Sequence, residues 1–177
     1  MTSWATFLQE QQAAGFPAFA GTHASVTVPI SDTFATAMAA ASLQSSATVR
    51  RISIKAGAGN VLHVRASLAK LAFLPEIPVD LRIERQPELP ASPILALRIL
   101  SIAGLPGGLA FLLQFVKDVP NEVSIQGTLV AIDLRALARR FGREDVFRYI
   151  TRLEVTTVEG AIVVAVDGGI PREAEPV

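Results

Sequence analysis

The chain lacks cysteine and has few aromatic residues, and each absence excludes a class of protein. Its 177 residues contain no cysteine, one tryptophan and one tyrosine, and aromatic residues make up 6% of the sequence. Without cysteine the chain forms no disulfide and performs no thiolate chemistry, so its composition does not indicate a redox compartment. The 16 basic and 16 acidic residues cancel. This neutral balance, together with the sparse aromatics, argues against a nucleic-acid partner.

Apolar side chains, in contrast, are present in excess. Half of the residues are hydrophobic, only 18% are charged, and the mean hydropathy is +0.42. A soluble domain of this size buries roughly 70% of the surface that its unfolded chain would expose. The chain has more apolar side chains than such a core requires. We therefore expect the surplus to face a ligand cavity, a second protomer or a membrane.

The most apolar stretch covers residues 94–116 and reads ILALRILSIAGLPGGLAFLLQFV. Its length would suit a membrane-spanning helix. However, Gly104 and Pro106 interrupt it in the middle, and Arg98 places a charge in its first half. The pattern favours a buried strand near 93–102 followed by a buried helix near 107–117, and a membrane span is the less favoured alternative.

Alternating apolar and polar residues predict further strands, and apolar residues at helical spacing predict helices. Ser31-Asp32 and Asp133 are expected to cap helices, a parity shift at Arg50-Arg51 predicts a bulge, and Glu159-Gly160 predicts a hairpin turn. The strands are expected at 23–30, 47–55, 61–68, 76–85, 122–132, 152–158 and 161–167, and the helices at 3–14, 31–43, 134–142 and 144–150.

These elements predict an α+β fold, in which a strongly curved antiparallel sheet of about eight strands wraps around one or two apolar helices. Residues 1–21 are expected to form an N-terminal amphipathic helix and linker, residues 22–168 a single domain, and residues 169–177 a flexible tail. The N-terminus has no basic segment followed by an apolar run, so it does not resemble a secretory signal. If Met1 is the true start, the protein is expected in the cytoplasm.

The sequence contains no recognisable catalytic or metal-binding motif. His23 and His63 fall on the polar faces of separate predicted strands, and neither belongs to an HExxH motif. There is no GxSxG elbow, and the glycines at 104–108 lack the Lys-Ser/Thr of a phosphate loop. We therefore expect a protein that is not an enzyme and that holds no metal or cofactor.

Two surface features have two interpretations each. Arg135, Arg139 and Arg143 share a helix face if the helix continues. They form either a salt-bridged surface or a patch for anionic lipid headgroups or an acidic partner. In the N-terminal helix, Trp4 and Phe7 either pack on the domain, which is the favoured interpretation, or enter a membrane interface.

The order of elements resembles that of a known lipid-binding family. VTVPISDTF leads into a helix of small residues, strands and LPGGLAFLLQFV follow, and then come VSIQGTLVAIDLRALARRFG and TRLEVTTVEGAIVVAVDGG. Over roughly residues 22–167 this is similar to small bacterial members of the tubular lipid-binding superfamily (TULIP). The resemblance implies a helix cradled by a curved sheet, acyl chains held between them, and no catalytic residues. The ligand-binding residues that it implies are Phe34, Met38, Leu81, Ile83, Leu100, Leu109, Leu112, Leu113 and Val116.

We therefore predict a non-catalytic protein that binds or transports a lipid-like apolar ligand in a groove between helices and curved sheet, with peripheral membrane contact as a further expectation. The alternative is a protein-interaction module that buries its excess apolar surface in a homodimer or partner interface. An enzyme acting on lipids is a third hypothesis, which no nucleophile–base pair in the sequence favours.

Overall fold

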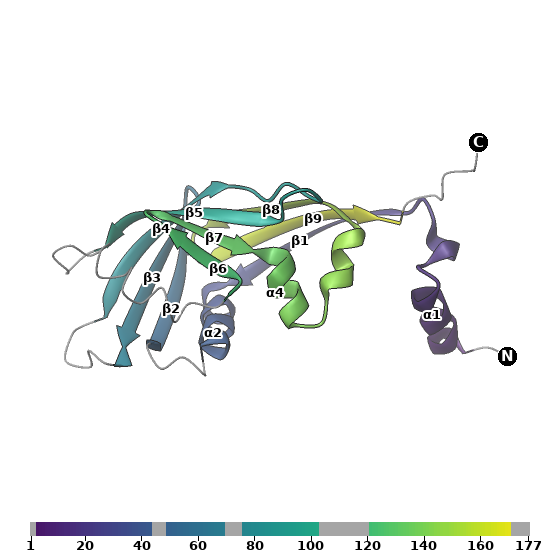
Figure 1. Cartoon of the computed structure of the whole chain (residues 1–177), viewed down its shortest axis with the longest axis horizontal. Coiled ribbons are helices and arrows are strands. Elements are labelled where there is room, and N and C mark those ends of the chain that lie inside the picture. Colours follow the sequence, from purple (N-terminus) through teal and green to yellow (C-terminus); the bar gives the residue numbers. More distant parts are fainter. Residues whose placement is uncertain (1–2, 44–48, 70–75, 103–120, 171–177) are drawn as a thin grey trace.

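The computed structural model of the chain describes residues 3–43, 49–69, 76–102 and 121–170. Within these ranges the protein is an α+β fold with nine strands in two antiparallel sheets (Figure 1). The three-stranded sheet has the order β1 (His23–Ser31), β9 (Ala161–Gly169) and β8 (Ile150–Val158). The six-stranded sheet has the order β2 (Val49–Gly57), β3 (Val61–Leu68), β4 (Ile77–Arg85), β5 (Ile94–Ile102), β7 (Leu129–Asp133) and β6 (Val123–Gln126).

The α+β class and the antiparallel pairing are confirmed, whereas two sheets take the place of the single sheet that we predicted. The prediction of one continuous strand at 122–132 is also wrong, because the chain reverses direction within this segment. Gly127 adopts a left-handed backbone with φ of 58°, and Gln126 pairs with Leu129 across the turn. The segment therefore forms the hairpin of β6 and β7. A single glycine inside an alternating run is a weak turn signal, which explains the error.

Five helical segments accompany the strands in the described part of the chain. Asp133 caps one of them as predicted, since its Oδ1 accepts a hydrogen bond from the backbone N–H of Ala136 at 2.9 Å. The register of β2 against β3 shifts between Val49 and Arg51, where a bulge was predicted. The helical segments are α1 (Trp4–Ala13), η1 (Pro17–Phe19), α2 (Asp32–Ser42), α4 (Leu134–Arg140) and η4 (Glu144–Arg148).

The core lies where the apolar faces of the two sheets meet. Ile83 of β4, Leu95 and Leu97 of β5, and Val155 of β8 form one buried cluster, and Ile162 of β9 packs against it. Leu97 is only 4% exposed. The strand predicted at 93–102 is thus confirmed as the buried strand β5, while the helix predicted at 107–117 lies outside the described residues.

Polar side chains join the two sheets at the free edge of β8. The Gln86 side chain donates to the carbonyl of Val155 at 2.7 Å and accepts from the Val155 N–H at 2.8 Å. The buried Thr157 hydroxyl donates to the carbonyl of Gly57 at 2.6 Å, and the Asn60 side chain accepts from the Thr157 N–H at 3.1 Å. These bonds pair backbone groups of an edge strand that would otherwise be open.

Helix α2 packs on the sheet with the side that carries Asp32, Ala35 and Thr36. The side that carries Phe34 and Met38 faces away from the sheet. The polar side chains of α2 bond to the edge strand β2: Asp32 accepts from the Ala56 N–H at 2.8 Å, and the Thr36 hydroxyl accepts from the Ile54 N–H at 2.9 Å. Ala35 is buried on this side. Phe34 and Met38, which the resemblance implied as ligand-binding residues, are 56% and 44% exposed, because the side of α2 that can bond the open edge of β2 is the polar one.

Helix α1 lies at one end of the long axis of the molecule, beyond the ends of the three-stranded sheet (Figure 1). Its N-cap is Ser3, whose hydroxyl accepts from the Thr6 N–H at 3.2 Å. The chain then turns through Gly15 and Phe16, both in left-handed backbone conformations, before η1 and β1. The predicted N-terminal helix is confirmed by this geometry, and the division into a linker, a domain and a tail stays a prediction.

Candidate ligand groove and basic cleft

The three-stranded sheet has one apolar face, and only part of it is covered. The register places Val26 of β1 opposite Val166 of β9, and Val166 opposite Leu153 of β8, so their side chains share this face. At one end of the face, Val155 and Ile162 pack on the core cluster. Toward α1 the cover ends, and Val26 is 52% exposed.

A groove of about 410 Å³ lies on the uncovered end of this face. Its floor consists of side chains and glycines of the three strands, and its walls consist of aromatic residues from the segment after α1 and from the turn before β8. The volume falls in the range of small-molecule sites. The groove is lined by Phe16, Phe19, Thr22, Ala24, Val26, Tyr149, Ile150, Val166, Gly168, Gly169 and Ile170.

Backbone geometry at Phe16 and Gly168 shapes this groove. Phe16 has a left-handed backbone with φ of 62°, which is rare for a bulky residue, and its ring meets that of Tyr149 edge-on at 6.0 Å. A Cβ atom at Gly168 would lie 2.5 Å from the carbonyl oxygen of Tyr149. Glycine is therefore required at this position, where the turn before β8 approaches the groove floor.

A second, larger cleft, called the basic cleft below, is lined by charged side chains: Arg135, Arg139 and Arg148 together with Glu144 and Asp145. It has a volume of about 850 Å³ and is formed mainly by α4, η4 and the start of β8. Arg139 and Glu144 form a bidentate ion pair across it, with N–O distances of 2.6 and 2.7 Å. This hydrogen bonding holds the pKa of Glu144 below its ordinary value and raises that of Arg139.

Two further arginines line the basic cleft without an ion pair among the described residues. The Arg135 guanidinium lies 5.8 Å from the centroid of the Phe147 ring and donates to the carbonyl of Pro90 at 3.3 Å. The Arg148 guanidinium lies 5.8 Å from the centroid of the Tyr149 ring. Both cations keep free donors for an anionic group.

The apolar groove and the basic cleft adjoin each other. Ile150 lines both of them, while its neighbours divide the two environments: Tyr149 lines the groove and Arg148 the cleft. The two environments therefore meet at Ile150.

The structure separates the predicted ligand-binding residues into three sets. Leu81 and Ile83 belong to the core, with Ile83 only 7% exposed. Phe34, Met38 and Leu100 are exposed and do not line the groove or the cleft. Leu109, Leu112, Leu113 and Val116 lie outside the described residues.

Of the predicted basic patch, Arg135 and Arg139 line the cleft, and the exposed Arg143 lies in the turn between α4 and η4. Sequence reasoning missed the groove itself and its aromatic walls. The available signal was Gly15-Phe16-Pro17, in which an aromatic residue stands between a glycine, which permits a turn, and a proline, which restricts the backbone.

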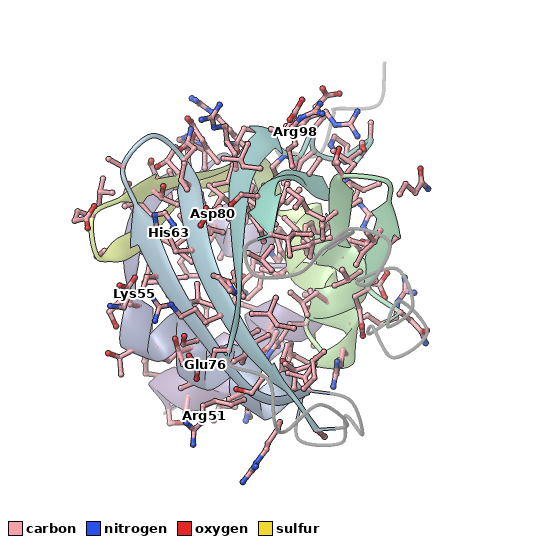
Figure 2. The ribbon with its side chains drawn as sticks, turned by 90° about the vertical axis from the view of Figure 1, so that its left-hand side faces the viewer. Arg51, Lys55, His63, Glu76, Asp80 and Arg98 are labelled. Atoms are coloured by element: carbon pink, nitrogen blue, oxygen red, sulfur yellow. The ribbon has the colours of Figure 1, made fainter. Side chains whose placement is uncertain are left out.

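The outer face of the six-stranded sheet carries a different polar cluster, in which His63 and Ser101 bond to the two oxygens of Asp80. Figure 2 labels His63 and Asp80, which come from the neighbouring strands β3 and β4. Nδ1 of His63 lies 2.8 Å from one oxygen, and the Ser101 hydroxyl donates to the other at 2.6 Å. Both bonds lower the pKa of Asp80, that from Ser101 more strongly. Because the hydroxyl and the imidazole bond to separate oxygens, this geometry is not that of a nucleophile activated by a base.

No group of three or more His, Cys, Asp or Glu side chains among the described residues is placed to hold a metal ion. None of the helices in the described ranges has the length and apolar character needed to cross a membrane. Comparisons with family models, with curated proteins and with solved structures find no match to this chain.

Proposed function

We propose that this protein binds and transports a lipid-like molecule, with the acyl part in the apolar groove and a polar, anionic part in the basic cleft. The observation that carries the proposal is the adjacency of the two sites at Ile150. No catalytic step is part of the proposal.

The energetics of such binding follow from the groove lining. Each methylene transferred from water into an apolar groove contributes roughly 0.8 kcal/mol. The groove walls offer mainly aliphatic and aromatic carbon, so burial of acyl carbon is the main driving force. Arg135 and Arg148 orient the anionic end, because their guanidinium donors are not used in ion pairs within the described residues.

The resemblance to the tubular lipid-binding superfamily supports the same function. Under this proposal the two sheets together form the curved surface typical of that family, and the exposed apolar stripe of α2 with Phe34 and Met38 adds to the lipid-binding surface. Leu81 and Ile83 then serve as support in the core beneath it.

The test uses two substitutions of the same kind on one strand. Val26 and Val28 are both exposed residues on the same face of β1, at 52% and 45%, but only Val26 lines the groove. Val26→Phe should fill part of the groove and weaken binding of a fluorescent fatty acid about tenfold or more, whereas Val28→Phe should leave it within twofold, given that tenfold corresponds to roughly 1.4 kcal/mol. Both variants should keep wild-type stability within about 0.5 kcal/mol, because the changed side chains are exposed.

The natural ligand is identified by organic extraction of the purified protein followed by mass spectrometry. Absence of any extracted lipid, together with no saturable uptake of the fatty acid probe, would refute the proposal. Equal losses of probe binding in the two phenylalanine variants would place the ligand elsewhere on the face and refute the assigned groove.

A protein-interaction module is the second candidate, and strand β1 is the observation that favours it. This strand is nine residues long, pairs only with β9 among the described strands, and exposes Val26 and Val28. An exposed apolar edge strand can pair with a second copy. Sedimentation equilibrium distinguishes the candidates, because an interface through β1 gives a concentration-dependent mass that both phenylalanine variants change.

A further inference from the structure

A continuous series of aromatic rings runs from α1 to the start of β8. Trp4 stacks on Phe7 at 5.4 Å, and Phe7 meets Phe19 at 6.4 Å. Phe19 meets Phe16 at 6.2 Å, and Phe16 meets Tyr149 at 6.0 Å. These five residues include the only tryptophan and the only tyrosine of the chain. At the outer end of the series, Trp4 is 68% exposed, so its indole ring is not used in the core.

A cation lies at the inner end of this series. The guanidinium of Arg148 lies 5.8 Å from the centroid of the Tyr149 ring, and Arg148 is exposed and makes no ion pair among the described residues. Helix α1 itself carries a single charge, that of Glu10. The end of the molecule that bears α1 is therefore aromatic and weakly charged, with a free arginine beside it.

This composition fits the boundary between water and lipid. Tryptophan and tyrosine favour the headgroup region, where their rings contact acyl carbon and their polar atoms stay hydrated. Arginine reaches anionic phosphates from the same depth. Helix α1 lies at the extreme end of the long axis (Figure 1), and its Trp4 ring is exposed there.

We propose that this end of the molecule, made of Trp4, Phe7, Phe16, Phe19 and Arg148, docks on the interface of a bilayer that contains anionic phospholipid. Phe16 and Phe19 also line the apolar groove, so docking brings the mouth of the groove to the bilayer. The inference goes beyond the proposed carrier function and does not require it, since a surface can dock without taking up lipid.

The single tryptophan makes the proposal directly measurable. Titration of the protein with vesicles of phosphatidylcholine and a minor share of phosphatidylglycerol should shift the Trp4 emission to the blue, and brominated acyl chains in the vesicles should quench it. Phe7→Ser should weaken vesicle binding roughly tenfold. Arg148→Gln should weaken binding about fivefold on vesicles with phosphatidylglycerol and leave binding to pure phosphatidylcholine unchanged.

Matched controls lie elsewhere on the surface. Phe141→Ser removes a ring from the end of α4 that is 54% exposed, whereas Phe7 is half-buried, so the control removes the more accessible of the two rings. Arg65→Gln removes an exposed cation from β3. Both controls should bind vesicles as the wild type does, and circular dichroism should show that Phe7→Ser keeps its helical content.

Three results would overturn the proposal. One is an emission spectrum that vesicles do not change, and another is vesicle binding that Phe7→Ser and Phe141→Ser weaken equally. The third is a blue shift that appears without vesicles and grows with protein concentration alongside the sedimenting mass, because it would assign the surface to a second copy of the chain. The fatty acid test with Val26→Phe measures ligand binding in the groove and not vesicle binding by this surface. A negative result for the carrier function can therefore be distinguished from a negative result for docking.

Discussion

Strands β4 and β1, one from each sheet, have the same alternating sequence pattern, but their apolar faces are covered to different extents. In the six-stranded sheet, β4 buries Ile77 at 5% and Ile83 at 7% exposure, and Val79 and Leu81 between them on the same face are half-buried. In the three-stranded sheet, the equivalent residues of β1 remain at the surface, with Val26 at 52% and Val28 at 45%. Alternation thus predicts which face of a strand is apolar, and a different property decides whether another element covers it.

That property is the position of the strand relative to the core. Strands β4 and β5 lie inside their sheet, and their apolar faces meet the end of the three-stranded sheet that contains Val155. Strand β1 is the edge strand of its sheet, and its apolar residues Val26 and Val28 stay exposed. The surplus of apolar side chains in the composition corresponds, within the described residues, to nine large exposed ones: Trp4, Val26, Val28, Phe34, Met38, Leu100, Phe141, Val146 and Val158.

The largest expected effect tests this contrast directly. Leu97→Ala removes a side chain that is 4% exposed from the core cluster and should lower the free energy of unfolding by about 2–5 kcal/mol. Val28→Ala on the exposed face should change it by less than about 0.5 kcal/mol. Urea unfolding of both variants, followed by circular dichroism, gives the comparison. A cost for Val28→Ala similar to that of Leu97→Ala would mean that the face of β1 is packed in solution.

A second prediction concerns the bonds that hold the two sheets together. Gln86→Ala leaves the N–H and carbonyl of Val155 without their side-chain partner at the free edge of β8. We expect a loss of about 1–3 kcal/mol in the free energy of unfolding, because Val155 is buried and water does not replace both bonds.

Gln126→Ala provides the control for this measurement, since Gln126 is an exposed residue of β6. Its substitution should cost less than about 0.5 kcal/mol. Amide hydrogen exchange would sharpen the result, because Gln86→Ala should speed exchange at Val155 selectively. Unchanged protection at Val155 would show that the side-chain bonds do not link the sheets.

Local signals in the sequence predicted most of the individual elements. Ser31 and Asp133 cap helices as their residue types indicate, and Gly160, with φ of 79°, occupies the predicted hairpin turn. These features depend on a few neighbouring residues, so a single sequence contains the information. Gly127 is the exception, because a lone glycine in an alternating run indicates a turn only weakly.

The arrangement of the elements depends on distant pairings and could not be predicted in this way. The resemblance implied that Phe34 and Met38 bind a ligand between helix and sheet, but the open edge of β2 takes the polar side of α2 that contains Thr36, and both residues are exposed. The groove likewise depends on Phe16, after α1, meeting Tyr149, before β8. Contacts over such separations in sequence leave no periodic signal, and the candidate site is composed of them.

The smallest effect belongs to the charged outer face of the six-stranded sheet, where Asp80 bonds to Ser101 and His63. These bonds lower the pKa of Asp80 from its ordinary value of 3.8. They therefore stabilise the folded state when the pH is above 3.8, and this stabilisation is lost as the pH falls through the lowered pKa of the folded state. Ser101→Ala removes the larger cause, so the pKa of Asp80 should rise toward 3.8. NMR titration of the Asp80 carboxyl carbon measures this shift. The stability difference between wild type and Ser101→Ala should be present at neutral pH and vanish in acid, whereas a difference that persists in acid would indicate that Ser101 acts through packing and not through the carboxylate.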